Sequence, residues 1–374
     1  MMITTLWLLA AVTFLAYANG ANDNFKAVAT VYGSKTLSYR GALTWATCSQ
    51  LAGSAAALTW GAHLVKIFSG KGLVSAEVIG QPAFLLAVGL GAAMAVMIAT
   101  RVGLPISTTH ALVGALVGGG YILDGHHLSI AVLGGVFFLP LLISPLLAFA
   151  LTVATYPIAS GVRRAMGVDV QTCLCVGPRP QPVSVTPLGQ MFVSGTTTQI
   201  TMDQAEHCRQ LYTGRMIGVP AKTLVDAGHL LSSGALGFAR GLNDTPKVIG
   251  LLLASGATGL NPSLALTLLA VAMATGGVLH ARQLAQTLGN KITQMNRGQG
   301  MIANLVASCL VIGASLAGHG VSTTHVSCGA IFGLGLCRRQ ADWKLVTGII
   351  AAWIGTLPLA AALAAGCAVL LGLL

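Results

Sequence analysis

The sequence predicts an all-α integral membrane protein with two inverted-topology repeats of about five transmembrane helices each, some of them discontinuous, joined by a cytoplasmic loop. Three observations support this prediction: an apolar composition, long apolar runs, and two polar motifs that each occur twice. Of 374 residues, 55% are hydrophobic and 8% are charged, with a mean hydropathy of +0.80. Soluble domains carry about 25% charged residues. We therefore expect the lipid bilayer to surround this chain.

Long apolar runs recur from one end of the chain to the other. A helix needs about 20 apolar residues to cross the hydrocarbon core, so we expect about ten crossings, several of them short or broken. The first run lacks a basic start and leads directly into a polar motif, which does not indicate a cleaved signal peptide. The runs cover approximately residues 2–18, 41–60, 82–100, 106–123, 129–157, 223–239, 248–256, 263–281, 301–317, 321–336 and 345–374.

The net charge of +11 indicates orientation rather than a nucleic-acid partner. Basic residues of membrane proteins gather in cytoplasmic loops. With the N-terminus placed outside, fifteen of the 20 lysines and arginines fall on the cytoplasmic side, and only Lys66 and Lys71 fall outside. We therefore expect both termini outside and a multi-pass protein of the cytoplasmic (inner) membrane, with no nucleic-acid partner.

Two different motifs are repeated in the same order. "YANGANDNFKAVAT" and "FARGLNDTPKVIGL" place Asn, Asp and Lys at the same internal spacing, 221 residues apart, and "PISTTH" and "GVSTTH" are 215 residues apart. These pairs define an N-terminal transmembrane repeat (1–157), a cytoplasmic loop (158–222) with a short strand-rich piece near 189–202, and a C-terminal transmembrane repeat (223–374). Five predicted crossings separate the two Asn-Asp motifs. Because five is odd, the second repeat should be inverted, an arrangement typical of transporters with a site near the membrane midplane.

The repeated aspartates are candidate ion ligands. Ionisable residues inside a membrane usually face a functional pathway. Asp23 and Asp244 could coordinate sodium or carry a proton, and Asn22 and Asn243 add amide groups beside them. The alternative is that each Asn-Asp pair caps a helix at the membrane surface.

Two lysines follow the aspartates by three residues, about one helical turn. Lys26 and Lys247 could attract or balance an anion. The alternative is an ion pair with Asp23 or Asp244, or a side chain that extends to the interface.

The STTH motifs predict an anion site. Gly103 with Pro105, and Gly318 with Gly320, predict a helix break before each motif. Serine or threonine is preferred at the N-cap of the helix that follows, where main-chain N–H groups and the helix dipole attract anions. The hydroxyls could donate to anion oxygens; the alternative is a bond back to the i−4 carbonyl of a buried helix. The motifs supply Ser107, Thr108, Thr109 and His110, and Ser322, Thr323, Thr324 and His325.

The two histidines leave alternatives open. His110 and His325 could orient the hydroxyls or titrate during transport, or could be buried neutral side chains bonded to a carbonyl.

Cysteines are less informative. Cys173, Cys175, His207 and Cys208 lie in the central loop, but C-x-C with a distant H-C is not a standard metal spacing, so we predict no metal. A cytoplasmic loop lies in a reducing compartment, which argues against a structural disulfide.

"GAND", "GLND", "PISTTH" and "GVSTTH" resemble the duplicated signature of the PiT family of inorganic phosphate transporters, or phosphate permeases. The likeness covers nearly the whole chain apart from the loop. It implies a symporter that moves phosphate with Na⁺ or H⁺ by alternating access, without a further cofactor, and commonly as a homodimer. It implies anion contacts from Ser107, Thr108, Thr109, Ser322, Thr323 and Thr324, and ion or anion roles for Asn22, Asp23, Asn243 and Asp244.

One departure from the family concerns the coupling ion. Sodium-coupled animal members carry a glutamate in the second helix of each repeat, where this chain aligns Gln50 and Asn304. Neutral residues there are found in bacterial members that are often proton-coupled. The family also includes sulfate permeases, so sulfate is the alternative substrate.

Two other functional classes, a hydrolase and a passive channel, are also considered for this sequence. Ser107 and His110 lie on one helix face and could form a hydrolase dyad. A hydrolase needs only one such dyad, however, and no G-x-S-x-G elbow occurs in the sequence. A passive anion channel does not require paired aspartates inside the membrane. We therefore predict a phosphate importer and no enzyme.

Overall fold

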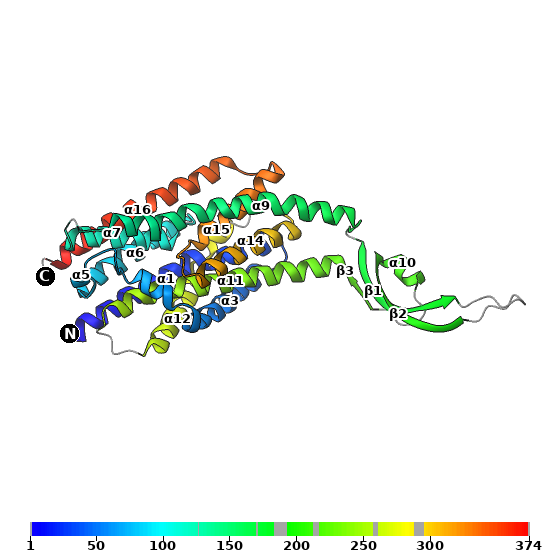
Figure 1. The fold of residues 1–374 in the computed structure, drawn as a ribbon, viewed down its shortest axis with the longest axis horizontal. Helices are drawn as coiled ribbons and strands as arrows, with labels where there is room; N and C mark the ends of the chain where they lie inside the picture. The colour runs from blue at the N-terminus through cyan, green and yellow to red at the C-terminus, as the bar shows by residue number, and fades with distance from the viewer. Residues whose placement is uncertain are drawn as a thin grey trace, which may run out of the picture. The chain divides into compact units, whose positions relative to one another are not determined.

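The computed structural model describes residues 2–125, 127–169, 171–182, 193–211, 217–256, 261–287 and 295–372 (Figure 1). Some of the lysines and arginines counted above lie outside these ranges, among them Arg215 and Lys291. Residues 189–192 of the predicted strand-rich piece lie outside them as well. The chain divides into two compact units. The helical unit comprises Met1–Tyr156 and His229–Leu374, and the central unit comprises Pro157–Gly228. The division of the membrane part into two repeats, and the side of the membrane on which the central unit lies, stay predictions.

Ten helices of 16 residues or more account for most of the described residues, five before and five after the strands of the central unit (Figure 1). They are α1 (Met2–Asp23), α3 (Tyr39–Trp60), α6 (Pro82–Val102), α7 (Thr108–Leu123), α9 (Leu139–Ala165), α11 (Ala221–Ala254), α12 (Pro262–His280), α14 (Arg297–Leu316), α15 (Thr323–Arg338) and α16 (Trp343–Gly372). Short helical turns connect them: η1 (Asn24–Val28), α2 (Ala29–Gly33), α4 (Ala62–Phe68), α5 (Ala76–Ile79), α8 (Ile130–Val132), η2 (Leu133–Phe138) and α13 (Arg282–Gln286).

Five spans among the described residues are long and apolar enough to cross a membrane by themselves, and a sixth is formed if α3 and α4, which meet at a bend of 87°, count as one span. The remaining long helices are either shorter or carry polar residues in their apolar stretch, as α1 and α11 do. This confirms the predicted helical membrane fold.

The predicted helix breaks are present before both STTH motifs. α6 ends at Val102 and is followed by Gly103, whose φ of 77° is left-handed, and Gly318 after α14 has a φ of 76°. A residue with a side chain adopts this conformation only at a cost, so glycine suits both stops. The chain is then non-helical over 104–107 and 319–322 before α7 and α15 begin.

One helix is longer than expected. The runs 223–239 and 248–256 were predicted as separate pieces, but α11 continues through both and contains Pro246. The polar residues between the runs, from Arg240 to Lys247, are buried with partners from other helices. The helix therefore need not end where its sequence turns polar. The equivalent stretch after α1 does not continue as an α-helix, because Asp23 is followed by the 3₁₀ turn η1.

The two halves of the helical unit contact each other at α7 and α15, the helices that begin after the two breaks and are called the broken helices below. A Cβ at Gly114 of α7 would lie 2.3 Å from the carbonyl oxygen of Leu357 in α16, and one at Gly329 of α15 would lie 2.4 Å from that of Pro145 in α9. Glycine at these positions lets the helix backbones approach closely, as is common in membranes. Each broken helix therefore packs against the last long helix of the other half.

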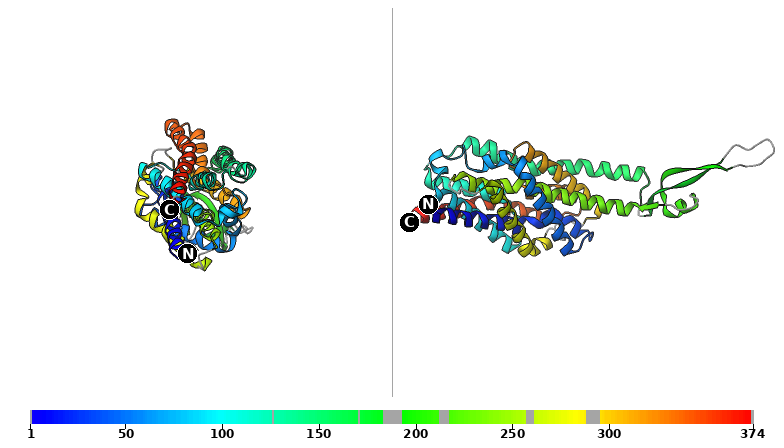
Figure 2. Two further views of the ribbon diagram at one scale, coloured as in Figure 1. Left: turned by 90° about the vertical axis from the view of Figure 1, so that its left-hand side faces the viewer. Right: turned by 90° about the horizontal axis from the view of Figure 1, so that it is seen from below.

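Both chain ends belong to the same end of the helical unit. Figures 1 and 2 show that α1 begins and α16 ends there. This agrees with the expectation that the two termini share one side of the membrane.

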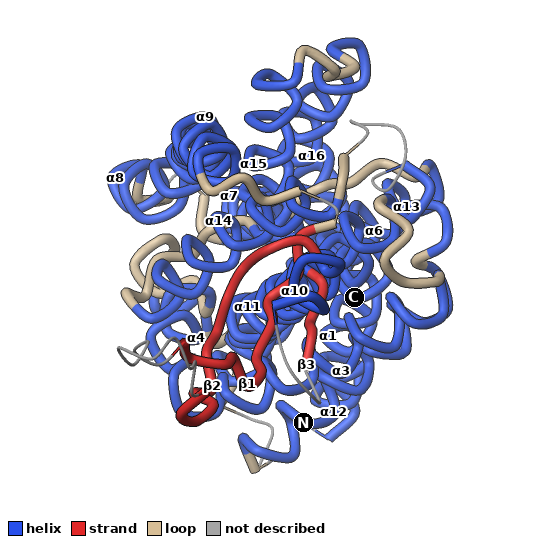
Figure 3. Tube along the Cα trace, turned by 90° about the vertical axis from the view of Figure 1, so that its right-hand side faces the viewer, coloured by secondary structure: helices blue, strands red, loops and turns tan. Residues whose placement is uncertain are grey.

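The central unit contains a three-stranded antiparallel sheet with the order β2-β1-β3 (Figure 3). Its elements are β1 (Thr172–Pro182), β2 (Val193–Gln204), α10 (Ala205–Leu211) and β3 (Ile217–Pro220). The strand-rich piece predicted near 189–202 is confirmed for the residues that the structure describes there.

The prediction against a disulfide in the loop was wrong. Cys175 of β1 and Cys208 of α10 are bonded, with their Cα atoms 6.3 Å apart, within the usual range for a bridge. Both are fully buried, and Cys173 lies beside them as a free, buried thiol. The prediction relied on the compartment alone, whereas folding of α10 over β1 brings the two thiols together. No group of three or more potential metal ligands occurs among the residues described.

Candidate functional site

The two STTH segments begin helices in the same way. Ser107 is the N-cap of α7, and its Oγ accepts a hydrogen bond from the main-chain N–H of His110 at 3.1 Å. Ser322 does the same for α15, with the N–H of His325 at 3.2 Å. The serine caps the third N–H of each helix, so the first two have no partner within the helix. The predicted N-caps are confirmed.

The two helix starts lie against each other. The Thr324 hydroxyl donates to the carbonyl of Ile106 at 2.9 Å, and the Thr109 hydroxyl donates to the carbonyl of Val321 at 3.4 Å. Each threonine therefore bonds the non-helical segment that precedes the other motif. The alternative interpretation required each hydroxyl to bond back to the i−4 carbonyl of its own helix. Neither hydroxyl forms such a bond. The two positive helix ends converge on one region of the helical unit.

Each aspartate faces the motif of its own half. Thr108 Oγ1 donates to Asp23 Oδ2 at 3.1 Å, and Thr323 Oγ1 donates to Asp244 Oδ2 at 3.3 Å. Asp23 is 1% exposed and Asp244 is 3% exposed. Both carboxylates are thus enclosed among helices, so they do not cap a helix at the membrane surface.

The neighbouring asparagines hold the non-helical segments in place. Asn22 Nδ2 donates to the Leu104 carbonyl at 3.1 Å, and its Oδ1 accepts from the N–H of Ile106 at 3.2 Å. Asn243 Nδ2 donates to the Val321 carbonyl at 3.0 Å. Both amides therefore satisfy main-chain groups that the helix breaks leave open.

The two lysines are buried in the same cluster. Lys26 forms an ion pair with Asp23, and Lys247 forms one with Asp244 at 3.3 Å. Of the alternatives given for these lysines, the structure contains the ion pairs. Both side chains are at most 5% exposed, so neither extends to the interface.

Arg240 is a site residue that the sequence reasoning missed. Its guanidinium donates to Asn19 Oδ1 at 2.9 Å and to Asn24 Oδ1 at 3.0 Å, and its Nε lies 3.8 Å from Asp244 Oδ2. The available signal was a charged residue in "FARGLND", directly after an apolar run. With Arg240 included, cationic side chains in this cluster outnumber carboxylates by one.

The two histidine rings contact each other at a tilt of 43° beside the helix starts. The ring centroids of His110 and His325 are 4.4 Å apart, and His325 stacks on Trp353 at 3.9 Å. Trp353 donates its indole N–H to the carbonyl of Pro105 at 3.1 Å. His325 Nδ1 lies 3.5 Å from the Leu141 carbonyl, the partner type that the neutral alternative predicted. The rings thus support the first non-helical segment from outside the hydroxyl cluster.

This geometry argues against a serine hydrolase. Ser107 Oγ accepts from the main-chain N–H of His110, while the imidazole of His110 contacts His325. A nucleophile needs its hydroxyl hydrogen-bonded to the base itself. Among the described hydrogen bonds, none joins Ser107 to the His110 ring.

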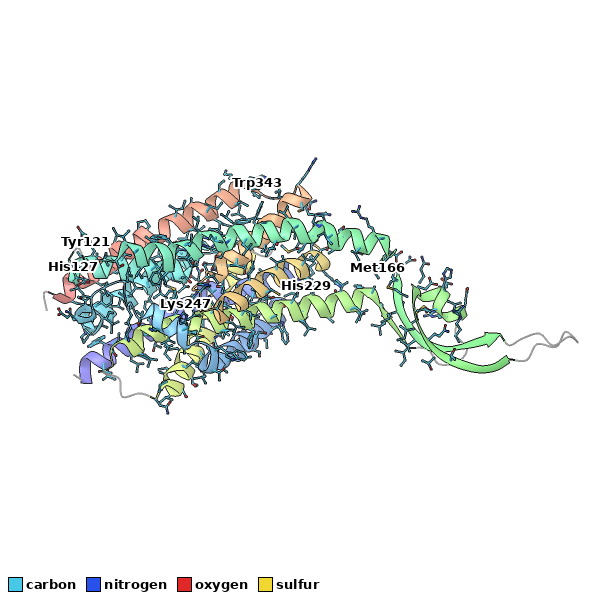
Figure 4. The ribbon with its side chains drawn as sticks, in the orientation of Figure 1. Tyr121, His127, Met166, His229, Lys247 and Trp343 are labelled. Carbon is cyan, nitrogen blue, oxygen red and sulfur yellow. A yellow bond between two sulfur atoms is a disulfide. The ribbon has the colours of Figure 1, made fainter. Side chains whose placement is uncertain are left out.

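The cluster is closed to solvent. Every serine, threonine and aspartate that forms it is at most 5% exposed. Figure 4 shows Lys247 in the middle of the helical unit, with side chains from several helices around it. A solute can reach this region only after the helices around it move.

The sequence profile described as the phosphate transporter family matches residues 19–364. The chain belongs to the phosphate transporter family. A protein of Pyrococcus abyssi named as a phosphate permease is 27% identical over 406 aligned residues, with 96% of each chain covered. The chloroplastic inorganic phosphate transporter 2-1 of Arabidopsis thaliana is 26% identical and covers 94% of this chain and 69% of its own. A solved structure described as the sodium-dependent phosphate transporter shares the fold, with a TM-score of 0.77 and 21% identity over 100% of both chains.

Membership of the phosphate transporter family agrees with the chemistry of the cluster. Two helix N-termini, several hydroxyls and three cationic groups can hold an oxyanion, since main-chain N–H groups at helix starts bind phosphate readily. Chains of this family are multi-pass membrane proteins, as the helical unit is.

The two neutral residues that depart from the family pattern form no described hydrogen bond with the aspartates. Gln50 Nε2 donates to Ser54 at 2.7 Å, and Asn304 Nδ2 donates to Thr30 at 2.8 Å. Asn304 lies on α14, the third long helix of the C-terminal half, whereas the alignment had placed it on the second.

Proposed function

We propose that this member of the phosphate transporter family imports inorganic phosphate across the cytoplasmic membrane as a symporter, with H⁺ or Na⁺ as the coupling cation. The observation that carries this proposal is the meeting of two broken-helix N-termini, one from each half of the chain, between paired acidic and basic side chains. A site of this kind at the junction of two halves is typical of alternating-access transporters.

The anion is held by groups from both halves. Main-chain N–H groups at the starts of α7 and α15 point toward it, and the hydroxyls of Ser107, Thr108, Thr109, Ser322, Thr323 and Thr324 surround it. Asn22 and Asn243 keep the non-helical segments in position. The excess positive charge of the lysines and Arg240 offsets the charge of the anion in a medium that solvates charge poorly.

The carboxylates favour phosphate over sulfate. At neutral pH phosphate carries at least one O–H group, and sulfate carries none. A protonated oxyanion can donate a hydrogen bond to Asp23 or Asp244, whereas sulfate would place only acceptors against them. Sulfate remains the second candidate because hydroxyls and N–H groups bind any tetrahedral oxyanion.

The coupling cation balances the cluster during transport. Asp23 with Asn22, and Asp244 with Asn243, supply the oxygen ligands or the proton acceptors. Moving an anion together with a cation lowers the cost of carrying charge through the centre of the membrane.

The contacts between the halves support an alternating-access mechanism. Thr324 with Ile106, and Thr109 with Val321, join the two halves in the closed state. Opening to either side requires these contacts to separate, so the two halves rock around the anion. The homodimer expected from the family resemblance is part of this proposal and affects none of its steps.

Uptake into proteoliposomes tests the proposal. Labelled phosphate and labelled sulfate are supplied in separate assays, each with an imposed proton gradient, sodium gradient or no gradient. Phosphate accumulation above equilibrium with one gradient, and its loss in Asp23→Asn and Asp244→Asn, is the expected result. Flux that ignores both gradients would identify a channel, and accumulation of sulfate alone would overturn the substrate.

A further inference from the structure

The ammonium group of Lys26 is surrounded by oxygen atoms. Its Nζ contacts Asn22 Oδ1 at 2.8 Å, the Ile106 carbonyl at 2.6 Å and Thr324 Oγ1 at 2.6 Å, in addition to Asp23 Oδ1. An ammonium group has three hydrogens to donate. Four oxygens around it exceed that number, so the arrangement resembles the coordination shell of a spherical cation.

Lys247 has the matching environment in the second half. Its Nζ contacts the Val321 carbonyl at 2.6 Å, Thr109 Oγ1 at 2.8 Å and Asp244 Oδ1 at 3.3 Å. It also lies 5.5 Å from the centre of the Phe68 ring, which attracts a cation. Both lysines thus bind the same four-part pattern: their own aspartate, the carbonyl before their own serine cap, and the second threonine of the opposite motif, with one further electron-rich group.

These oxygens are the ligands that a hard metal cation would use. Carboxylates, amide oxygens, hydroxyls and main-chain carbonyls bind such ions, and carbonyls of unwound segments beside broken helices coordinate sodium in transporters. Ile106 and Val321 lie in the two non-helical segments, so their carbonyls are free of helical hydrogen bonds.

Each carboxylate oxygen already has at least one polar partner. Asp23 Oδ2 accepts from Thr108 and Asn19, while its Oδ1 contacts Lys26. Asp244 Oδ2 accepts from Thr323 and lies near Arg240, while its Oδ1 contacts Lys247. A sodium ion placed here would have to displace an ammonium group or lie beside it, and like charges at such a distance repel strongly.

We propose that Lys26 and Lys247 are tethered cations that occupy the two cation positions of the site, so that phosphate transport by this chain does not require sodium. The proposal rests on the proposed function and specifies its coupling: the side chains stay with the protein, which leaves the proton as the transported cation. Each ammonium group also joins its own aspartate to the opposite motif and so helps to close the site.

The test compares phosphate uptake in proteoliposomes with sodium or with choline as the external cation, at equal pH. Wild-type uptake driven by a proton gradient should agree within about twofold in the two media. Lys26→Met and Lys247→Met should lose at least about tenfold in choline and regain uptake as sodium is added, because the empty oxygen shell then accepts the ion. Lys344→Met, an exposed lysine outside the site, should behave as the wild type.

Three results would overturn the proposal. The first is wild-type uptake that falls at least about tenfold in choline. The second is wild-type co-transport of labelled sodium with phosphate, which needs no variant and therefore decides even if the variants do not fold. The third is a folded lysine variant that sodium fails to restore. Wild-type vesicles that accumulate no phosphate under any gradient would instead refute the proposed function.

Discussion

Thr324→Val removes one hydroxyl at the contact between the two halves. That hydroxyl accepts from Lys26 Nζ at 2.6 Å and donates to the Ile106 carbonyl at 2.9 Å. A hydrogen bond to a charged group contributes about 1.5–3 kcal/mol and a neutral one about 0.5–1.5 kcal/mol. The closed state should therefore lose about 2–4.5 kcal/mol, and because each transport cycle passes through it, uptake should slow by about 30- to 2000-fold.

The matched change in the other half should have a smaller effect. Thr109 accepts from Lys247 at 2.8 Å, but its own bond to the Val321 carbonyl is long, at 3.4 Å. Counting the charged bond alone gives about 1.5–3 kcal/mol, or about 10- to 150-fold in uptake for Thr109→Val.

Initial rates of labelled phosphate uptake measure both changes, normalised to the amount of protein in the vesicles. Thr347→Val is the control, because that hydroxyl is exposed and bonds only to carbonyls of its own helix. Uptake by Thr324→Val within about threefold of the wild type, or a larger loss in Thr347→Val, would refute the reasoning.

Two further predictions concern packing and acid stability. Gly329→Ala places a methyl group 2.4 Å from the Pro145 carbonyl and should destabilise the protein by about 1–3 kcal/mol in thermal unfolding, whereas Gly355→Ala meets open space and should not; equal melting temperatures would contradict this. The pKa of Asp124 lies below its ordinary value because the Ser75 hydroxyl and N–H donate to the carboxylate. A depressed carboxyl pKa stabilises the folded state above about pH 4, and this contribution is lost as the pH falls further. Ser75→Ala should therefore lower the melting temperature at neutral pH, and its difference from the wild type should vanish in acid; a difference that is independent of pH would contradict the assignment.

The features that could be predicted from the sequence depend on neighbouring residues. Composition and run length predict a helical membrane protein, and Gly103 and Gly318 predict where helices stop because only local backbone geometry is involved. Ser107 and Ser322 were predictable as caps for the same reason. The duplicated motifs also predicted polar side chains that the structure brings together, since polar residues inside a membrane usually have a functional reason.

The features that could not be predicted depend on distant partners. The sequence shows that Lys26 lies three residues after Asp23, but not that it reaches Thr324, 298 residues away. Arg240 directly follows an apolar run, and only the packing of α11 brings it to Asn19. The same limit explains the undivided helix α11, whose polar residues are satisfied by other segments of the chain.

The disulfide in the central unit has a different lesson. The expectation of a reducing compartment applies to thiols in general. The structure instead brings two particular thiols together, those of Cys175 and Cys208, because α10 folds over β1. Local geometry therefore outweighed the environment that the sequence reasoning had assigned to the loop.

The central claim is that the two STTH motifs form the walls of a single anion site. Equilibrium binding of labelled phosphate to the purified protein tests it most directly, with the number of bound phosphates per chain as the readout. We predict one phosphate per chain, and loss of that phosphate when either Thr108 or Thr323 is replaced by valine. Two phosphates per chain, or one that survives in either variant with unchanged affinity, would contradict the account.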